Sequence, residues 1–200
     1  MARSIKIPPP DGRTGEIPVG AASLPDALPV LPLKDSVPFP EMLTPLAVGQ
    51  QRSVELVNDV LGGNRMLVMV ASRDGEVENP GPEDLYGVGV AGVVARMLKV
   101  PDGSLRILVQ GGQRVELGEP VQRDPYLISR IAPVPDVLEP SPELEALFRN
   151  VQQTFTQIVE QVPYLPEELQ LAVANVDDPA ELAHMIAGSL RITGQPSSRE

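Results

Sequence analysis

The stretch from Tyr86 to Gln113 constrains the fold of this chain more than any other. Two runs rich in Val, Leu and Ile flank the tetrapeptide 101–104, Pro-Asp-Gly-Ser. Asp-Gly between such runs is a strong hairpin signal, because glycine reaches the positive φ that the turn needs. Apolar residues occupy nearly every position of both runs, which is typical of strands covered on both faces. The sequence therefore predicts a β-hairpin at the centre of a β-rich domain.

Residues 87–92 of the first strand read Gly-Val-Gly-Val-Ala-Gly and match the dinucleotide-binding pattern G-x-G-x-x-G. In a nucleotide site this pattern follows a strand and opens a helix, whose N-terminus holds the pyrophosphate. Here the residues after Gly92 continue as a strand, and no acidic residue stands where the ribose partner is expected. We therefore interpret these glycines as places where the strand bulges or another backbone approaches closely.

Charge and composition exclude several function classes. The 200 residues carry a formal net charge of −11, and the three lysines form no basic run. Nucleic-acid binding rests on neutralising phosphates with Lys and Arg, so no nucleic-acid partner is expected. The chain has neither an apolar stretch of about eighteen residues to span a bilayer nor a signal peptide. The lack of cysteine excludes disulfides and thiolate metal sites and fits a reducing cytoplasm, and one histidine cannot build a zinc cluster.

Stretches rich in Pro and Gly, together with shifts in composition, divide the chain into four parts. We predict a disordered N-terminal arm over 1–27, a β-rich domain over 28–133, a helical subdomain over 134–192 and a frayed tail over 193–200. Besides the hairpin, the β-rich domain is predicted to contain strands at 28–33, 44–48, 65–71, 114–117 and 126–131, and a helix at 50–61. Prolines in the first of these strands cannot donate ladder hydrogen bonds, which predicts an edge position. The pair Gly62-Gly63 is expected to end the helix in the left-handed conformation.

Helix-start signals dominate the second half of the chain. Ser141 and Asp178 are each followed by Pro and then by acidic residues, the pattern of an N-cap with a favourable first turn. A shorter helix is predicted between them, from Pro166 to Asn175. His184 lies beside apolar neighbours with no matched nucleophile or acid, so we interpret it as a structural residue rather than a catalytic one.

A set of motifs in a fixed order runs from about Leu28 to Ile192, and each motif is weak when taken alone. The motifs are Leu28–Asp35, Phe39–Met42, Pro45-Leu46, Val48-Gly49, Pro80–Gly89, Leu98–Gly103, Val109–Arg114 and Val176–Ala183. Together they resemble the N-terminal domain of the Lon protease family. The resemblance implies an α+β fold, namely a PUA-like six-stranded pseudo-β-barrel with one helix, followed by a small α-helical bundle.

The resemblance also implies a function. Such a domain recognises unfolded or damaged protein substrates and supports assembly of a homohexamer, as part of a cytoplasmic ATP-dependent serine protease. The fragment by itself is expected to be a monomer or a dimer. The nucleotide-binding motif G-x-x-x-x-G-K-[ST] is absent from the sequence, so ATP and magnesium are expected only for an ATPase part outside this chain, and the gene is expected to continue past Glu200.

A Ser–Lys peptidase dyad would need Lys6, Lys34 or Lys99 as its base. None of these lysines lies where burial would lower its pKa, which a catalytic lysine requires. We therefore expect no catalytic residue and no cofactor site in this chain. A self-contained hydrolase would be revealed by turnover in a protease assay on the chain alone.

The candidate substrate-binding residues are Phe39, Met42 and Leu43, which lie on a loop stiffened by prolines. Exposed apolar side chains can hold unfolded polypeptides, and methionine adapts to varied partners. In the alternative interpretation these side chains plug the end of the barrel. Two other functions stay open: a stand-alone Lon-domain protein that binds a peptide or small ligand, and an RNA-binding domain, which the acidic charge disfavours.

Overall fold

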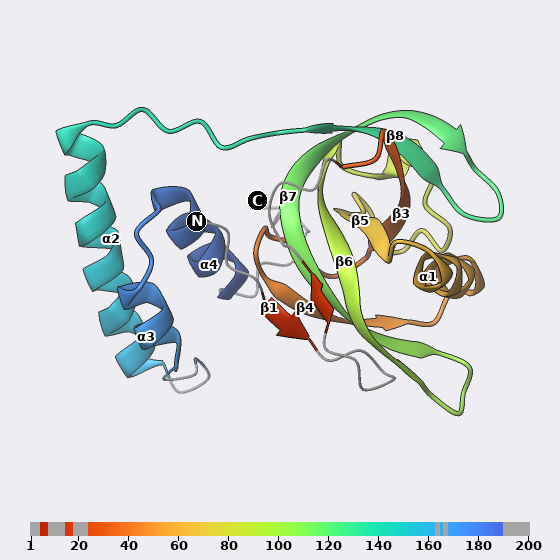
Figure 1. Ribbon diagram of the computed structural model, residues 1–200, viewed down its shortest axis with the longest axis horizontal. Coiled ribbons are helices and arrows are strands. Elements are labelled where there is room, and N and C mark those ends of the chain that lie inside the picture. The colour runs from red at the N-terminus through yellow and green to blue at the C-terminus, as the bar shows by residue number, and fades with distance from the viewer. Residues whose placement is uncertain (1–4, 8–14, 18–23, 163–164, 166–167, 190–200) are drawn as a thin grey trace, which may run out of the picture.

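The computed structural model describes residues 5–7, 15–17, 24–162, 165 and 168–189. A barrel of strands lies at one end and a group of helices at the other (Figure 1). The elements in chain order are β1 (Ile5–Ile7), β2 (Gly15–Ile17), β3 (Ala27–Leu33), β4 (Leu43–Val48), α1 (Gln51–Gly62), β5 (Met66–Ala71), the 3-10 turn η1 (Pro82–Asp84), β6 (Val88–Lys99), β7 (Leu105–Gln122), β8 (Ile128–Pro133), α2 (Pro142–Gln161), α3 (Glu168–Ala174) and α4 (Pro179–Ser189).

Six strands form the barrel in the order β4-β7-β6-β5-β3-β8, and a further pairing of β7 with β8 closes it. The predicted α+β fold, a six-stranded barrel with one helix followed by a small helical unit, is confirmed. Instead of the separate strand expected at 114–117, β7 is one strand of 18 residues. Register shifts near Pro120 let it bend and pair with β4, β6 and β8 along its length.

The predicted hairpin is present as β6 and β7. Lys99 pairs with Leu105, and Gly103 between them has a φ of 87°. The Ser104 backbone N–H donates to Asp102 Oδ1 at 2.9 Å, which fixes the turn. The Ser104 hydroxyl also donates to this carboxylate, and its hydrogen bond, followed by that of the backbone N–H, lowers the pKa of Asp102.

Two of the three glycines of residues 87–92 serve the packing of β6. A Cβ added at Gly89 would lie 2.5 Å from the Met69 carbonyl oxygen of β5, and one at Gly92 would lie 2.7 Å from the Gln110 carbonyl oxygen of β7. Gly89 and Gly92 both lie within β6, and no helix follows them. The interpretation of the motif as a close-approach feature is confirmed.

The edge position predicted for β3 is wrong. Residues 27–29 pair with β8 on one side, and residues 30–33 pair with β5 on the other. Backbone donors alternate between the two sides of a strand, and the Val30 N–H donates to the carbonyl of Leu127, which immediately precedes β8. The N–H that Pro29 lacks would point toward β5, but β3 pairs with β5 only from Val30 onward. The N–H that Pro32 lacks would point toward β8, but β3 pairs with β8 only as far as Pro29. Each proline falls where the ladder has no partner, so β3 can close the barrel.

Alternation along β5 places apolar side chains in two cores. Leu67 and Met69 pack with α1 in one cluster, while Val68 and Val70 belong to the other. All four are buried, as the apolar run predicts. Each fully buried side chain of this kind contributes about 1.5–3 kcal/mol before the cost of ordering it.

The end of α1 differs from the prediction. Gly63 has a φ of −118°, so no left-handed glycine ends the helix. Instead Arg65 takes a φ of 62°, and its N–H donates to the Val60 carbonyl at 2.9 Å. The chain thus turns into β5 two residues later than the glycine pair suggests.

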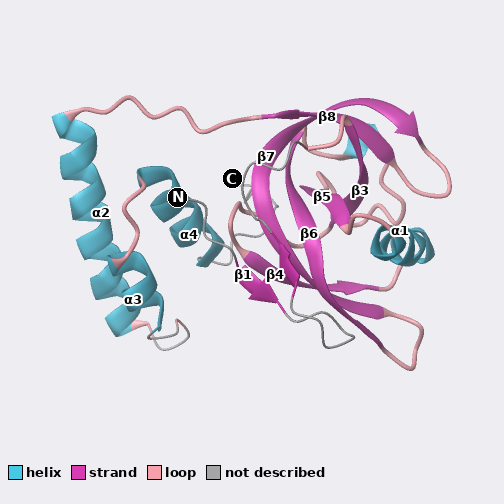
Figure 2. Cartoon of the chain, in the orientation of Figure 1, coloured by secondary structure: helices cyan, strands magenta, loops and turns pink. Residues whose placement is uncertain are grey.

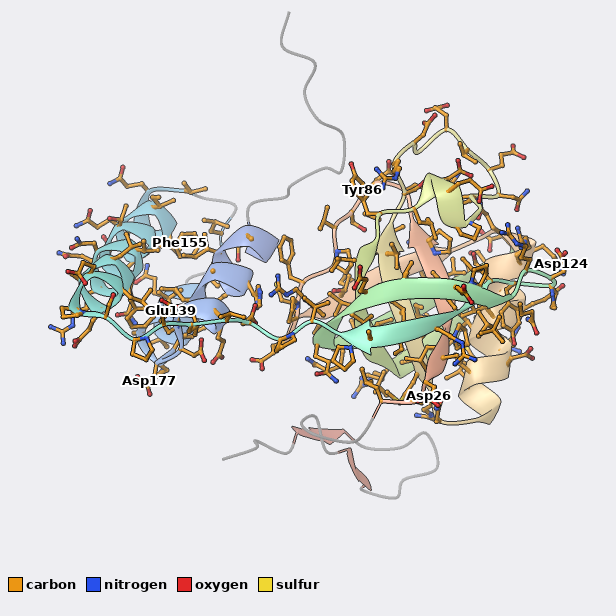
Figure 3. All side chains as sticks on the ribbon, turned by 90° about the horizontal axis from the view of Figure 1, so that it is seen from above. Asp26, Tyr86, Asp124, Glu139, Phe155 and Asp177 are labelled. Atoms are coloured by element: carbon orange, nitrogen blue, oxygen red, sulfur yellow. The ribbon has the colours of Figure 1, made fainter. Side chains whose placement is uncertain are left out.

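The helical unit has its own core, with α4 between α2 and the barrel (Figures 1 and 2). Both predicted N-caps are confirmed: the Leu144 N–H donates to Ser141 Oγ at 3.1 Å, and the Ala180 N–H donates to Asp178 Oδ1 at 2.7 Å. Figure 3 labels Phe155, which belongs to this core. The core comprises Phe155, Val159, Leu165, Val173, Val176 and Leu182.

The N-terminal arm differs in part from the predicted disorder. β1 and β2 form a two-stranded antiparallel ribbon. Leu24 packs against the barrel, and Ala27 already belongs to β3. Residues 1–4, 8–14 and 18–23 of the arm, and the predicted frayed tail over 193–200, lie outside the described residues.

Candidate functional site

The loop that carries the candidate residues lies across a bend in β7. The Gln110 side-chain amide donates to the Glu41 carbonyl at 3.1 Å, and the Gly111 N–H donates to the Met42 carbonyl at 2.8 Å. A Cβ at Gly111 would lie 2.7 Å from the Phe39 carbonyl oxygen, so only glycine permits this approach. Glu41 takes a φ of 58° at the tip of the loop. The backbone of the loop is therefore fixed by β7.

The structure brings Phe39 and Met42 to the joint between the barrel and the helical unit. Both side chains are half-buried, and their partner is Gly188 of α4. A Cβ at Gly188 would overlap Met42 Sδ and would lie 3.5 Å from Phe39 Cδ2. Leu43, the third candidate, begins β4 and is 48% exposed. We call these three residues the apolar patch; α4 lies against Phe39 and Met42, and Leu43 is exposed.

Polar side chains complete the joint. Arg114 of β7 donates to Asp136 of the linker between β8 and α2. His184 Nε2 of α4 lies 3.8 Å from the same Asp136 carboxylate, and the His184 side chain is only 15% exposed. A cleft of about 280 Å³ lies beside them. His184 thus has an acidic neighbour that sequence reasoning missed, because linker and helix meet only in the fold.

A second hollow lies beside α1. We call it the α1 slot. Its volume is about 510 Å³, and it is lined by the end of β3, the turn after it, β4 and the start of α1. In Figure 1, α1 lies on the side of the barrel away from α2, α3 and α4. Sequence reasoning did not identify the slot, since its walls come from two stretches, 31–36 and 45–53, that meet only in the fold.

The helix at this slot is held on its other side. Tyr126 donates its hydroxyl to Asp59 Oδ2 at 2.7 Å, and Arg52 Nε donates to the Pro125 carbonyl at 2.9 Å. The hydrogen bond to Asp59, together with burial, raises the pKa of Tyr126, because the phenolate would lose the bond. These bonds fix α1 against the loop between β7 and β8.

Within the described ranges, no three His, Cys, Asp or Glu side chains are grouped so as to hold a metal ion. Among the helices of the described chain, none is both long and apolar enough to span a bilayer. One buried side-chain nitrogen in this part of the chain, Arg114 Nε, has no hydrogen-bond partner. The features that remain for function are the apolar patch at the joint and the α1 slot.

A mixed barrel of six strands with one helix at its side and a helical unit joined by a linker defines an α+β barrel domain with an appended helical bundle. Residues 27–196 match a family model described as the ATP-dependent protease La (LON) substrate-binding domain. This chain belongs to that family.

Relatives of this chain include several bacterial Lon proteases. The chain is 37% identical over 164 residues to the Lon protease of Dictyoglomus thermophilum, covering 82% of this chain and 21% of the relative. It is 41% identical over 164 residues to that of Koribacter versatilis, covering 82% of this chain and 20% of the relative. The chain therefore spans about a fifth of the length of these proteases.

Solved structures show the same fold. The N-terminal domain of Mycobacterium avium complex Lon protease matches with a TM-score of 0.68 and 17% identity, over 84% of this chain and 85% of that one. The Lon N-terminal domain protein from Xanthomonas campestris matches with a TM-score of 0.50 and 20% identity, over 80% of this chain and 96% of that one.

Proposed function

We propose that this chain binds unfolded or damaged polypeptides for an ATP-dependent serine protease. ATP hydrolysis, which uses magnesium, and peptide cleavage are assigned to parts of the whole protein other than these residues. The observation that carries the proposal is the match of residues 27–196 to a substrate-binding domain. Lon protease relatives of which this chain covers only about a fifth support it.

The binding surface in this proposal is the patch of Phe39, Met42 and Leu43. Its backbone is fixed by β7, while Leu43 is 48% exposed and the other two side chains are half-buried against Gly188. An apolar surface on a rigid support binds an unfolded chain without sequence preference, since unfolded proteins display apolar side chains that folded ones bury. Met42 adds adaptability, because its thioether side chain fits varied shapes.

The test is binding of a fluorescent, permanently unfolded polypeptide to this chain, measured by anisotropy. We expect the combined substitutions Phe39→Ser, Met42→Ser and Leu43→Ser to weaken binding at least fivefold. Leu98→Ser is the matched control, because Leu98 is also on the barrel and is 67% exposed. Equal affinity of the patch variant and the control, with circular dichroism showing both folded, would remove the patch from the proposal.

For the whole protein we propose a cytoplasmic homohexamer in which each copy of this domain presents its patch to clients. Mass measurement of the full-length protein with ATP and magnesium tests the assembly. A monomer under those conditions would overturn this part of the proposal without affecting client binding by the domain.

A further inference from the structure

The α1 slot combines apolar walls with the start of a helix. Residues from β3 and β4 face each other across it, and Gly49, Gln50 and Ser53 line its third side. The apolar wall residues are Leu31, Leu33, Pro45, Leu46 and Val48. Lys34 and Asp35 also line the slot, so the charges of its lining side chains cancel. Any preference for a charged ligand must therefore come from the helix start.

The start of α1 has no cap. Gln50 occupies the N-cap position in an extended conformation, and it makes no side-chain hydrogen bond to the helix. Its side-chain amide instead donates to the Glu78 carbonyl. No acidic residue lies in the first turn. The first backbone N–H groups of this 12-residue helix are thus left without a protein acceptor, at the positive end of the helix dipole.

Ser53 gives an independent indication of a ligand. The residue is only 9% exposed and it lines the slot. Its hydroxyl makes no hydrogen bond within the described residues, where Arg114 Nε is the one fully buried side-chain N or O atom without a partner, so the Ser53 hydroxyl is open to the slot. Ser53 lies in the first turn of α1, next to the uncapped N–H groups. A ligand with strong acceptor oxygens would satisfy both the hydroxyl and the helix start.

The strand edges that border the slot argue against a client bound as an added strand. The Met42 carbonyl accepts from Gly111 of β7, so by alternation the missing donor of Pro45 faces away from β7, toward the open edge of β4. Pro32, on the other wall, lacks its donor on the side that β8 leaves open. Each edge therefore loses a donor at its centre, which is how edge strands are kept from pairing.

We propose that the α1 slot binds the C-terminal end of a client polypeptide. The terminal carboxylate lies at the start of α1 and accepts from Ser53 and the free N–H groups, and the last apolar side chain lies between the β3 and β4 walls. This inference rests on the proposed function, since it names the part of the client that the domain recognises. Apolar walls favour a chain end with an apolar side chain over inorganic phosphate.

The test compares two fluorescent apolar pentapeptides that differ only at the C-terminus, one a free acid and the other an amide, by anisotropy with the whole chain. We expect the amide to bind at least tenfold more weakly. Ser53→Asp places a carboxylate in the first turn, where it favours the helix and occupies the anion position, so it should abolish binding of the acid peptide. Asn58→Asp adds the same charge on the exposed side of α1 and should leave binding within twofold.

Competition by small anions distinguishes a polypeptide C-terminus from a small carboxylate or phosphate as the ligand of the slot. N-acetyl-leucine and inorganic phosphate should displace the acid peptide only at concentrations at least a hundredfold above the peptide's own Kd. Displacement by either at concentrations near that Kd, equal binding of acid and amide, or full binding by the Ser53→Asp variant would each overturn the proposal. Binding of the unfolded polypeptide would still stand if only the slot proposal failed, whereas loss of that binding would refute the proposed function itself.

Discussion

Gly89→Ala gives the sharpest test of why this chain contains a G-x-G-x-x-G motif. A methyl group at Gly89 would lie 2.5 Å from the Met69 carbonyl oxygen and 2.6 Å from Val70 Cγ2, both on β5. These atoms belong to a buried ladder and cannot move aside cheaply. Overpacking of this kind costs about 1–3 kcal/mol of unfolding free energy. For a chain of this size, that lowers Tm by about 2–12 °C.

Gly87 supplies the matched control within the same motif. It has nothing within 4 Å of its added Cβ, so Gly87→Ala should leave the unfolding free energy unchanged or raise it by about 0.4–1 kcal/mol through the unfolded state. Urea unfolding followed by circular dichroism measures both variants. Equal stability of the two variants would refute the close-approach argument. Measurable binding of a dinucleotide, lost equally in both, would restore the nucleotide interpretation.

Three further predictions concern the caps, the pH response and the joint. Ser141→Ala removes the acceptor for the Leu144 N–H and should cost about 1 kcal/mol of α2 stability, seen as faster hydrogen exchange in its first turn; unchanged exchange would contradict the cap. The Tyr126 pKa is raised in the folded state, so the stabilisation is complete below about pH 10 and is lost as pH rises through the raised value. With Tyr126→Phe, the urea concentration at the unfolding midpoint should fall less between pH 9 and pH 11 than it does in the unaltered chain. The same dependence on pH in both proteins would exclude Tyr126 as its cause. Gly188→Leu should push α4 away from Met42 and at least double the affinity for the unfolded polypeptide, with Gly62→Leu as the control in open space; affinity equal to that of the control would show that α4 does not limit the patch.

Local chemistry made much of the fold predictable. The Asp102-Gly103 turn and the caps at Ser141 and Asp178 lie where the sequence places them, because each depends on neighbours within a few residues. The prediction of an edge position for β3 failed because it treated a strand as having one neighbour along its whole length. In the barrel, β3 changes partner between Pro29 and Val30. That change depends on strands about 40 and 100 residues away, which no local pattern reports.

The candidate sites were predictable to different degrees. The apolar loop at Phe39 and Met42 was visible because prolines and large apolar side chains cluster in it. The partner of that loop, Gly188, was not visible, since a glycine inside a helix gives no sign of what packs against it. Ser53 was missed for a related reason: a serine in a first helical turn is ordinary, and only the fold shows that this largely buried residue lines a slot.

The two candidate surfaces lie toward different ends of β4, since Leu43 begins the strand and Val48, at its end, lines the slot, and this arrangement bears on how they act. The patch at Phe39 and Met42 touches α4, so any movement of the helical unit alters its exposure. The helix α1, whose start lines the slot, lies away from α2, α3 and α4 (Figure 1), and Tyr126 and Arg52 hold it to the barrel. Substitutions at sites without shared partners are additive. Changes at Gly188 should therefore alter affinity for an unfolded chain and leave the preference for a free C-terminal carboxylate unchanged, because the first property depends on the joint and the second on the barrel alone.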